Sequence, residues 1–147
     1  MTKPNISTVQ SYLFFDGKTE EAIEFYRKAL GAEVVMMLRF KDSPQEPKAG
    51  CEPPAGTENK IMHAQFKVGK TVIMASDGRC SGHPKFDGFG LAIATATDAD
   101  TDRAFNALAH GGQVQMPLEK TLFASSFGMV SDKFGVMWMI MTESAEK

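Results

Sequence analysis

The sequence predicts an α+β fold made of two βαβββ modules with a mixed sheet. The first observation is a repeat: FFDGKTEEAIEFYRKALGAEV, residues 14–34, has a counterpart in ATATDADTDRAFNALAHGGQV, residues 94–114. The second is that each copy is a strand-like run followed by an amphipathic helix that ends at glycine. The third is that only strand-like runs follow each helix, which favours a mixed sheet over a doubly wound one. Since repeated units of this size bury together what neither buries alone, we expect function in the cleft between them.

The elements of the first half are predicted from apolar runs and from the residues that begin and end them. Val9–Phe15 is apolar and aromatic and predicts a strand, which Asp16-Gly17 ends. Thr19 is the predicted N-cap of a helix with an acidic first turn, and Gly31 ends that helix. Three further strands are predicted, over Glu33–Lys41, Ile61–Val68 and Thr71–Ser76. The proline-containing segment Asp42–Lys60 is predicted to be a loop.

The second half repeats this order. Phe89–Ala96 predicts a strand, Thr97 or Asp98 the helix cap, and Gly111-Gly112 the helix end. The remaining strands are predicted over Gln113–Pro117, Thr121–Val130 and Val136–Met141. We therefore expect a single domain over residues 1–147, with module one at 8–77, a linker at 78–88 and module two at 89–142.

Composition limits the kinds of partner. The chain has 147 residues, 43% of them hydrophobic, and a net charge of −2 without a block of like charge, which argues against nucleic acid. No apolar run is long enough to span a bilayer, and residues 1–10 contain no signal-peptide core. The two cysteines, Cys51 and Cys80, are predicted to be free thiols. We expect a cytoplasmic protein with no membrane partner.

Three stretches carry a resemblance to a known family: YLFFDGKTEEAIEFYRKALGAEV from Tyr12, IMHAQFKVGKTVIMASD from Ile61 and GMVSDKFGVMWMIM from Gly128. In this order they resemble the vicinal oxygen chelate superfamily of glyoxalase, bleomycin-resistance and extradiol dioxygenase proteins. They are most similar to its PhnB-like branch, often labelled 3-demethylubiquinone 3-methyltransferase. The resemblance covers most of Gln10–Met141 and implies a glyoxalase-like cupped mixed sheet around a small-molecule cleft, in a homodimer. No Gly-rich turn follows a strand and opens a helix, so the residues do not support the methyltransferase label.

The resemblance also implies four metal ligands, drawn from His, Gln and Glu, on the first and last strand of each module. The residues that fall at these positions are apolar: Val9, Ile73 or Met74, Leu91 and Met139. Gln10 is the one oxygen donor nearby, and only if the register shifts by one residue. Because a thioether is a poor ligand for Zn, Mg, Mn or Fe(II), we expect no metal site and no cofactor.

His63 is the strongest candidate for a functional residue. Strand alternation places His63 and Gln65 on one face of Ile61–Val68, opposite a wholly apolar face. Imidazole titrates near neutral pH, so His63 can hydrogen-bond a ligand or transfer a proton. The alternative is a histidine that satisfies a backbone group or a carboxylate at the rim.

The remaining candidates for ligand binding are Tyr12, Phe14, Met74, Met137 and Met139. Methionine adapts to irregular ligands, but filling the core is the alternative role for all five residues. The place of Met139 at the missing Glu position favours the methionine face of the last strand for the ligand. Trp138, on the other face, is then expected to pack against a helix.

Three functions stay open at this point. The first is a metal-independent small-molecule-binding protein that sequesters or senses a largely apolar ligand. The second is a lyase, isomerase or dioxygenase-like enzyme with a relocated site, in which His63, Gln65 and a carboxylate such as Asp77 or Glu119 supply the chemistry. The third is a structural or interaction module. The sequence assigns no catalytic residue and no ligand.

Overall fold

The structure is a computed structural model that describes residues 2–42, 56–78 and 83–143. It contains two compact units. The first consists of Met1–Ile23 and Ala32–His83, and the second of Glu24–Gly31 and Pro84–Lys147. Cys51 and Cys80, predicted to be free thiols, lie outside the described residues.

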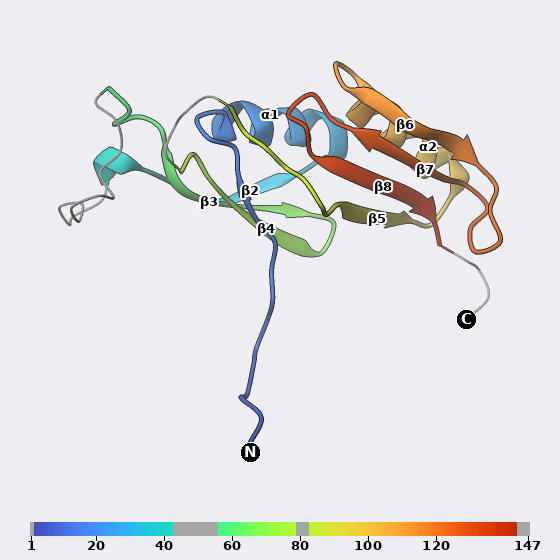
Figure 1. Ribbon diagram of the computed structural model, residues 1–147, viewed down its shortest axis with the longest axis horizontal. Coiled ribbons are helices and arrows are strands. Elements are labelled where there is room, and N and C mark those ends of the chain that lie inside the picture. Colours follow the sequence, from blue (N-terminus) through green and yellow to red (C-terminus); the bar gives the residue numbers. More distant parts are fainter. Residues whose placement is uncertain (1, 43–55, 79–82, 144–147) are drawn as a thin grey trace. The chain divides into compact units, whose positions relative to one another are not determined.

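The first unit holds one mixed four-stranded sheet, in the order β1-β4-β3-β2 (Figure 1). Its elements are β1 (Tyr12–Phe14), the start of α1 (Thr19–Leu30), β2 (Glu33–Arg39), the 3₁₀ turn η1 (Phe40–Asp42), β3 (Ile61–Val68) and β4 (Thr71–Ser76). β1 runs parallel to β4, and the other pairs are antiparallel. This arrangement brings the first and last strands of the unit side by side.

The second unit repeats the topology, with the order β5-β8-β7-β6. Its elements are β5 (Leu91–Thr95), α2 (Asp98–Ala109), β6 (Gln113–Glu119), β7 (Phe127–Ser131) and β8 (Met137–Thr142). β5 runs parallel to β8, while β6, β7 and β8 are antiparallel neighbours. The predicted α+β fold of two βαβββ modules is confirmed.

One face of each sheet forms the core. In the first unit, alternate residues such as Leu13, Phe66 and Ala75 are buried. In the second, Trp138 and Ile140 are buried, and the methionines that alternate with them on β8 are half-buried. Burial of these apolar faces supplies the main stabilisation of each unit.

Helix α1 is shared between the units, because Glu24–Gly31 cluster with the second one. The helix has glutamates in its first turn and basic residues in its last, and Gly31, at φ 69°, ends it. The Tyr26 ring packs edge-on against Trp138, with 5.5 Å between ring centroids. The prediction that Trp138 packs against a helix is confirmed.

The two helix starts differ from each other. Thr97 is the N-cap of α2, and its side chain accepts a hydrogen bond from the Asp100 backbone N–H, as one of the predicted alternatives states. The predicted N-cap role of Thr19 is wrong. Thr19 is the first residue within α1, and its own backbone N–H donates to Asp77 Oδ1 at 2.8 Å.

The predicted strand over Thr121–Val130 begins later, at Phe127. A turn precedes it, in which the Thr121 backbone N–H donates to the Ala124 carbonyl and the Ala124 N–H returns to the Thr121 hydroxyl. Such side-chain to backbone bonds compete with strand pairing.

Neither α1 nor α2 is long and apolar enough to cross a membrane, and no other α-helix lies in the described part of the chain.

Candidate functional site

A row of four residues crosses the first sheet on the face opposite its core. Tyr12 on β1 lies opposite Met74 on β4, Met74 opposite Gln65 on β3, and Gln65 opposite Met36 on β2. We call this side, with Phe14 and His63, the first open face. Its residues are half-buried or exposed, and Phe14 is 57% exposed. All five candidates from the first unit therefore lie on one face.

The polar side chains of the first open face form a hydrogen-bonded chain. The Tyr12 hydroxyl lies 2.9 Å from His63 Nδ1, and Gln65 Nε2 lies 3.3 Å from His63 Nε2. With the Gln65 amide nitrogen donating to the ring, His63 carries its proton on Nδ1 and donates to the tyrosine oxygen. The tyrosine O–H then points away from His63 and can donate to a ligand.

The surroundings of Tyr12 favour the protonated form of its hydroxyl, which can donate a hydrogen bond. Burial raises the pKa of Tyr12 above its ordinary value, and a hydrogen bond from the Ser76 side chain partly opposes that shift. The phenol is therefore neutral at physiological pH and keeps its O–H. The sequence reasoning did not select Ser76, although it follows Met74 by two residues on β4 and so shares its face.

An aromatic surface adjoins this polar chain. The Tyr12 and Phe14 rings stack with centroids 4.9 Å apart and an interplanar angle of 27°. The His63 ring is tilted against Tyr12 at 5.5 Å. Exposed aromatic rings beside hydrogen-bonding groups can contact an apolar ligand and orient its polar end.

The second sheet carries the equivalent row without polar groups. Ala92 lies opposite Met139, Met139 opposite Met129, and Met129 opposite Met116. We call this side, which also carries Met137, the second open face. It is an apolar surface of flexible thioethers. The two repeats have thus kept the same row positions but not the same chemistry.

The residues present do not fit the divalent metal that the fold family implies. Tyr12 and Met74 in the first unit correspond by register to Ala92 and Met139 in the second. Ala92, rather than Leu91, shares a face with Met139. Among these four side chains only the tyrosine offers an oxygen, and no group of three or more His, Cys, Asp or Glu side chains is gathered within the described residues.

The first carboxylate considered as a partner for His63, Asp77, is bonded to backbone groups instead. Asp77 is 1% exposed, and its oxygens accept hydrogen bonds from the backbone N–H groups of Gly17, Thr19 and Ile61. This carboxylate therefore ties the start of α1 to the start of β3. Glu119, the other carboxylate considered, is the last residue of β6.

Comparison with known proteins assigns the chain to a family. The model of the family described as 3-demethylubiquinone-9 3-methyltransferase matches residues 7–141. Protein YjdN of Escherichia coli K12 is 35% identical over 133 residues, which cover 88% of this chain and 90% of that protein. The chain belongs to this family. It is the PhnB-like branch of the vicinal oxygen chelate superfamily.

Solved structures agree with that assignment. Protein PA1353 from Pseudomonas aeruginosa shares 40% identity, with a TM-score of 0.79 over 94% of this chain and 98% of its own. A putative 3-demethylubiquinone-9 3-methyltransferase, PhnB protein, from Bacillus cereus shares 28% identity, with a TM-score of 0.73 over 92% of this chain and 99% of its own. A glyoxylase/bleomycin resistance protein/dioxygenase domain from Frankia, at 14% identity and a TM-score of 0.61 over 97% of this chain and 96% of its own, shares the fold.

Proposed function

We propose that this PhnB-like chain is a metal-independent small-molecule-binding protein whose ligand contacts the first open face. The observation that carries the proposal is the Tyr12–His63 hydrogen bond of 2.9 Å beside the exposed Phe14 ring. A polar pair held in place on a sheet face, next to exposed aromatic surface, is the combination that ligand sites use. The ligand is then a small, largely apolar molecule with one hydrogen-bonding group.

The difference between the repeats supports this assignment of the ligand's polar group. The row of the first sheet has Tyr12 and Gln65 where the row of the second has Ala92 and Met129. Only the first face therefore offers hydrogen bonds along the row. A ligand group that needs such bonds is bound by the first unit.

Metal independence is supported by the donor set. The four row positions that correspond to the superfamily's ligand strands carry one phenol, one methyl group and two thioethers, in Tyr12, Ala92, Met74 and Met139. Thioethers do not suit the hard or borderline divalent ions of that chemistry. We propose in addition that the protein is a cytoplasmic homodimer, as the family resemblance implies.

Methyl transfer, which the family description names, is not the function we propose. The connections from strand to helix, residues 15–18 and 96–97, contain a single glycine, Gly17. A nucleotide-type cofactor is bound by a Gly-rich turn at such a connection. Neither connection of this PhnB-like chain provides one.

Native mass spectrometry of freshly purified protein tests the proposal, because it reports retained metal and retained small molecule together. We expect protein without a stoichiometric divalent ion. One tightly held divalent ion per chain would contradict metal independence.

Titration with p-cresol, a probe with an apolar ring and one hydroxyl, then tests the location by amide chemical shifts. We expect shifts on β1, β3 and β4, and weaker binding in Tyr12→Phe and His63→Ala. His110→Ala, at the C-cap of α2, is the matched histidine control and should bind as the wild type does. Shifts elsewhere, or unchanged binding in both variants, would reject this face as the site.

A second candidate function is an enzyme with general acid–base chemistry at His63. The observation that favours it is the orientation of the imidazole by two partners, Tyr12 and Gln65. Among the residues that the structure describes, the nearest candidate carboxylate in the sequence, Asp77, is committed to backbone N–H groups rather than to His63. Loss of turnover of an identified substrate in His63→Ala, with binding retained, would favour the enzyme over the binding protein.

A further inference from the structure

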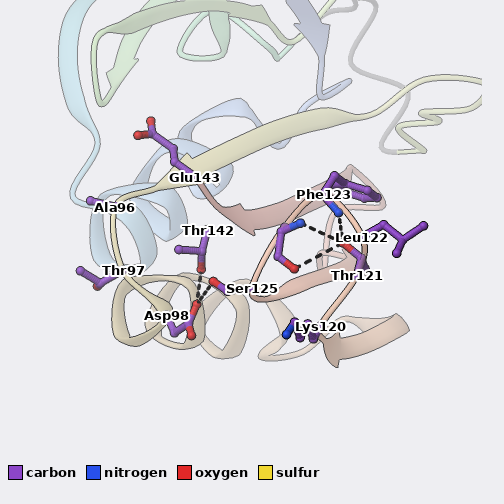
Figure 2. A pocket seen from close by; sticks show the side chains of 11 residues that line it. Ala96, Thr97, Asp98, Lys120, Thr121, Leu122, Phe123, Ser125, Thr142 and Glu143 are labelled. Atoms are coloured by element: carbon purple, nitrogen blue, oxygen red, sulfur yellow. Dashed lines mark hydrogen bonds between the residues drawn. The ribbon is translucent and has the colours of Figure 1, made fainter. Parts of the chain in front are cut away.

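A hollow of about 710 Å³ lies in the second unit, and none of the residues that define the two open faces lines it. The start of α2, the end of β8 and the loop between β6 and β7 line it (Figure 2). Its volume is within the range of about 300–1,000 Å³ that small-molecule sites occupy. All of its lining residues belong to one unit.

Asp98 is held in place at the wall of this hollow. Its Oδ1 atom accepts hydrogen bonds from Ser125 Oγ at 2.6 Å and from Thr142 Oγ1 at 2.7 Å (Figure 2). Thr142 is itself bonded to Thr101 at 2.7 Å, which fixes the hydroxyl. Two segments distant from Asp98 in the sequence, the β6–β7 loop and the end of β8, therefore orient this carboxylate before any ligand arrives.

The carboxylate of Asp98 does not cap α2, the helix in which Asp98 is the first residue. Thr97 is the N-cap, so its side chain rather than that of Asp98 accepts the first free backbone N–H. Within the described residues, neither Asp98 nor Glu143 forms an ion pair. The hydrogen bonds from Ser125 and Thr142 lower the pKa of Asp98, so it is ionised at neutral pH.

The rest of the lining combines charge with exposed apolar surface. The lining contains two acidic residues, Asp98 and Glu143, and one basic residue, Lys120, so its formal charge is negative. At its lip Leu122 is fully exposed and Phe123 is 60% exposed. Two large apolar side chains presented to water beside a preorganised carboxylate indicate a ligand that has both a positive charge and an apolar body.

We propose that this hollow is a second binding site, selective for a small organic ammonium ion with an apolar body. The ammonium group binds Asp98 Oδ2, and the apolar body lies on Leu122 and Phe123. Because the site lies wholly in the second unit, it does not depend on the ligand proposed for the first open face.

The test uses the whole protein and a pair of probes matched in shape. Amide chemical shifts are followed while 2-phenylethylammonium or the neutral 2-phenylethanol is added. We expect the ammonium ion to shift residues 96–98, 121–125 and 142–143, and to bind about tenfold more tightly than the alcohol, since charge-assisted hydrogen bonds are the stronger ones. Equal affinity for the two probes, or shifts away from these residues, would overturn the proposal.

Variants provide the second arm of the test. Asp98→Asn should weaken ammonium binding about tenfold and leave alcohol binding unchanged. Asp102→Asn, an exposed acid on the same helix that does not line the hollow, should bind as the wild type does. Unaltered ammonium binding in Asp98→Asn would refute the assigned contact.

Two further outcomes keep the test decisive. If Asp98→Asn fails to fold, the comparison of the two probes on the wild type still decides the question. If Leu122 and Phe123 respond to protein concentration while neither probe shows charge selectivity, the surface contacts a second copy of this chain and the ammonium site is rejected.

Discussion

The Tyr26 hydroxyl donates a hydrogen bond of 2.5 Å to Asp132 Oδ2 in the second unit. Asp132 is 3% exposed, and it also accepts from Trp138 Nε1 at 2.9 Å and from the backbone N–H groups of Phe134 and Val136. A helix that begins in the first repeat thus supplies a donor to the β7–β8 turn of the second. The full set of four hydrogen bonds to this buried carboxylate forms only when α1 is in place.

Replacing this donor should destabilise the protein. Tyr26→Phe leaves the Asp132 carboxylate short of one buried hydrogen bond, which costs about 1–3 kcal/mol. Urea unfolding followed by circular dichroism measures the loss. Tyr12→Phe, an exposed tyrosine in the other unit, is the control and should change stability by less than about 1 kcal/mol. Equal effects of the two changes would show that the Asp132 contact is not a stabilising one.

The same tyrosine predicts a loss of stability at alkaline pH. Burial, then the Asp132 charge, raises the pKa of Tyr26 well above its ordinary value. A folded pKa above the unfolded one means that the contribution is complete below about pH 10 and is lost as pH rises through the folded pKa. The stability difference between wild type and Tyr26→Phe should therefore shrink above about pH 10. A difference that stays constant with pH would contradict the raised pKa.

Two buried threonines at helix starts should respond oppositely to the same substitution. The Thr19 hydroxyl is buried and has no hydrogen-bond partner among the residues that the structure describes, whereas the Thr101 hydroxyl bonds both Thr95 and Thr142 at 2.7 Å. Thr19→Val, which keeps the shape, should stabilise the protein by about 1 kcal/mol, because an unsatisfied buried group is removed. Thr101→Val should destabilise it by about 1–2 kcal/mol. Thermal and urea unfolding of the two variants decide the signs, and a loss of stability in Thr19→Val would contradict the first.

These cases show which features a sequence can predict. Thr97 caps α2 through Asp100, three residues away, so the pattern was visible locally. The start of α1 instead depends on Asp77, which is 58 residues from Thr19 along the chain. Only the β1-β4-β3 strand order brings the end of β4 beside the start of the helix. Spacing in the sequence therefore wrongly predicted Thr19, the nearest threonine, as the N-cap of α1.

The candidate sites also combine features that the sequence predicts with contacts between residues that lie far apart in the chain. Strand alternation was enough to place His63 and Gln65 together on one face. The contact between His63 and Tyr12 spans 51 positions and follows from the parallel pairing of β1 with β4. The hollow around Asp98 was not foreseen, because Ser125 and Thr142 reach that carboxylate from 27 and 44 positions away.

Asp77 gives the last prediction, on the junction between α1 and β3. Oδ1 accepts from the N–H groups of Gly17 and Thr19, and Oδ2 accepts from that of Ile61 at 2.6 Å. Asp77→Asn replaces one of these acceptors with an NH₂ group that faces a donor, so one side of the junction must break. Because the site is buried, we expect a loss of about 2–3 kcal/mol in the free energy of unfolding. Asp102→Asn, an exposed aspartate, should cost less than about 0.5 kcal/mol. If both variants unfold at the wild-type urea concentration, the three N–H groups do not depend on the carboxylate, and the start of α1 is held by its packing alone.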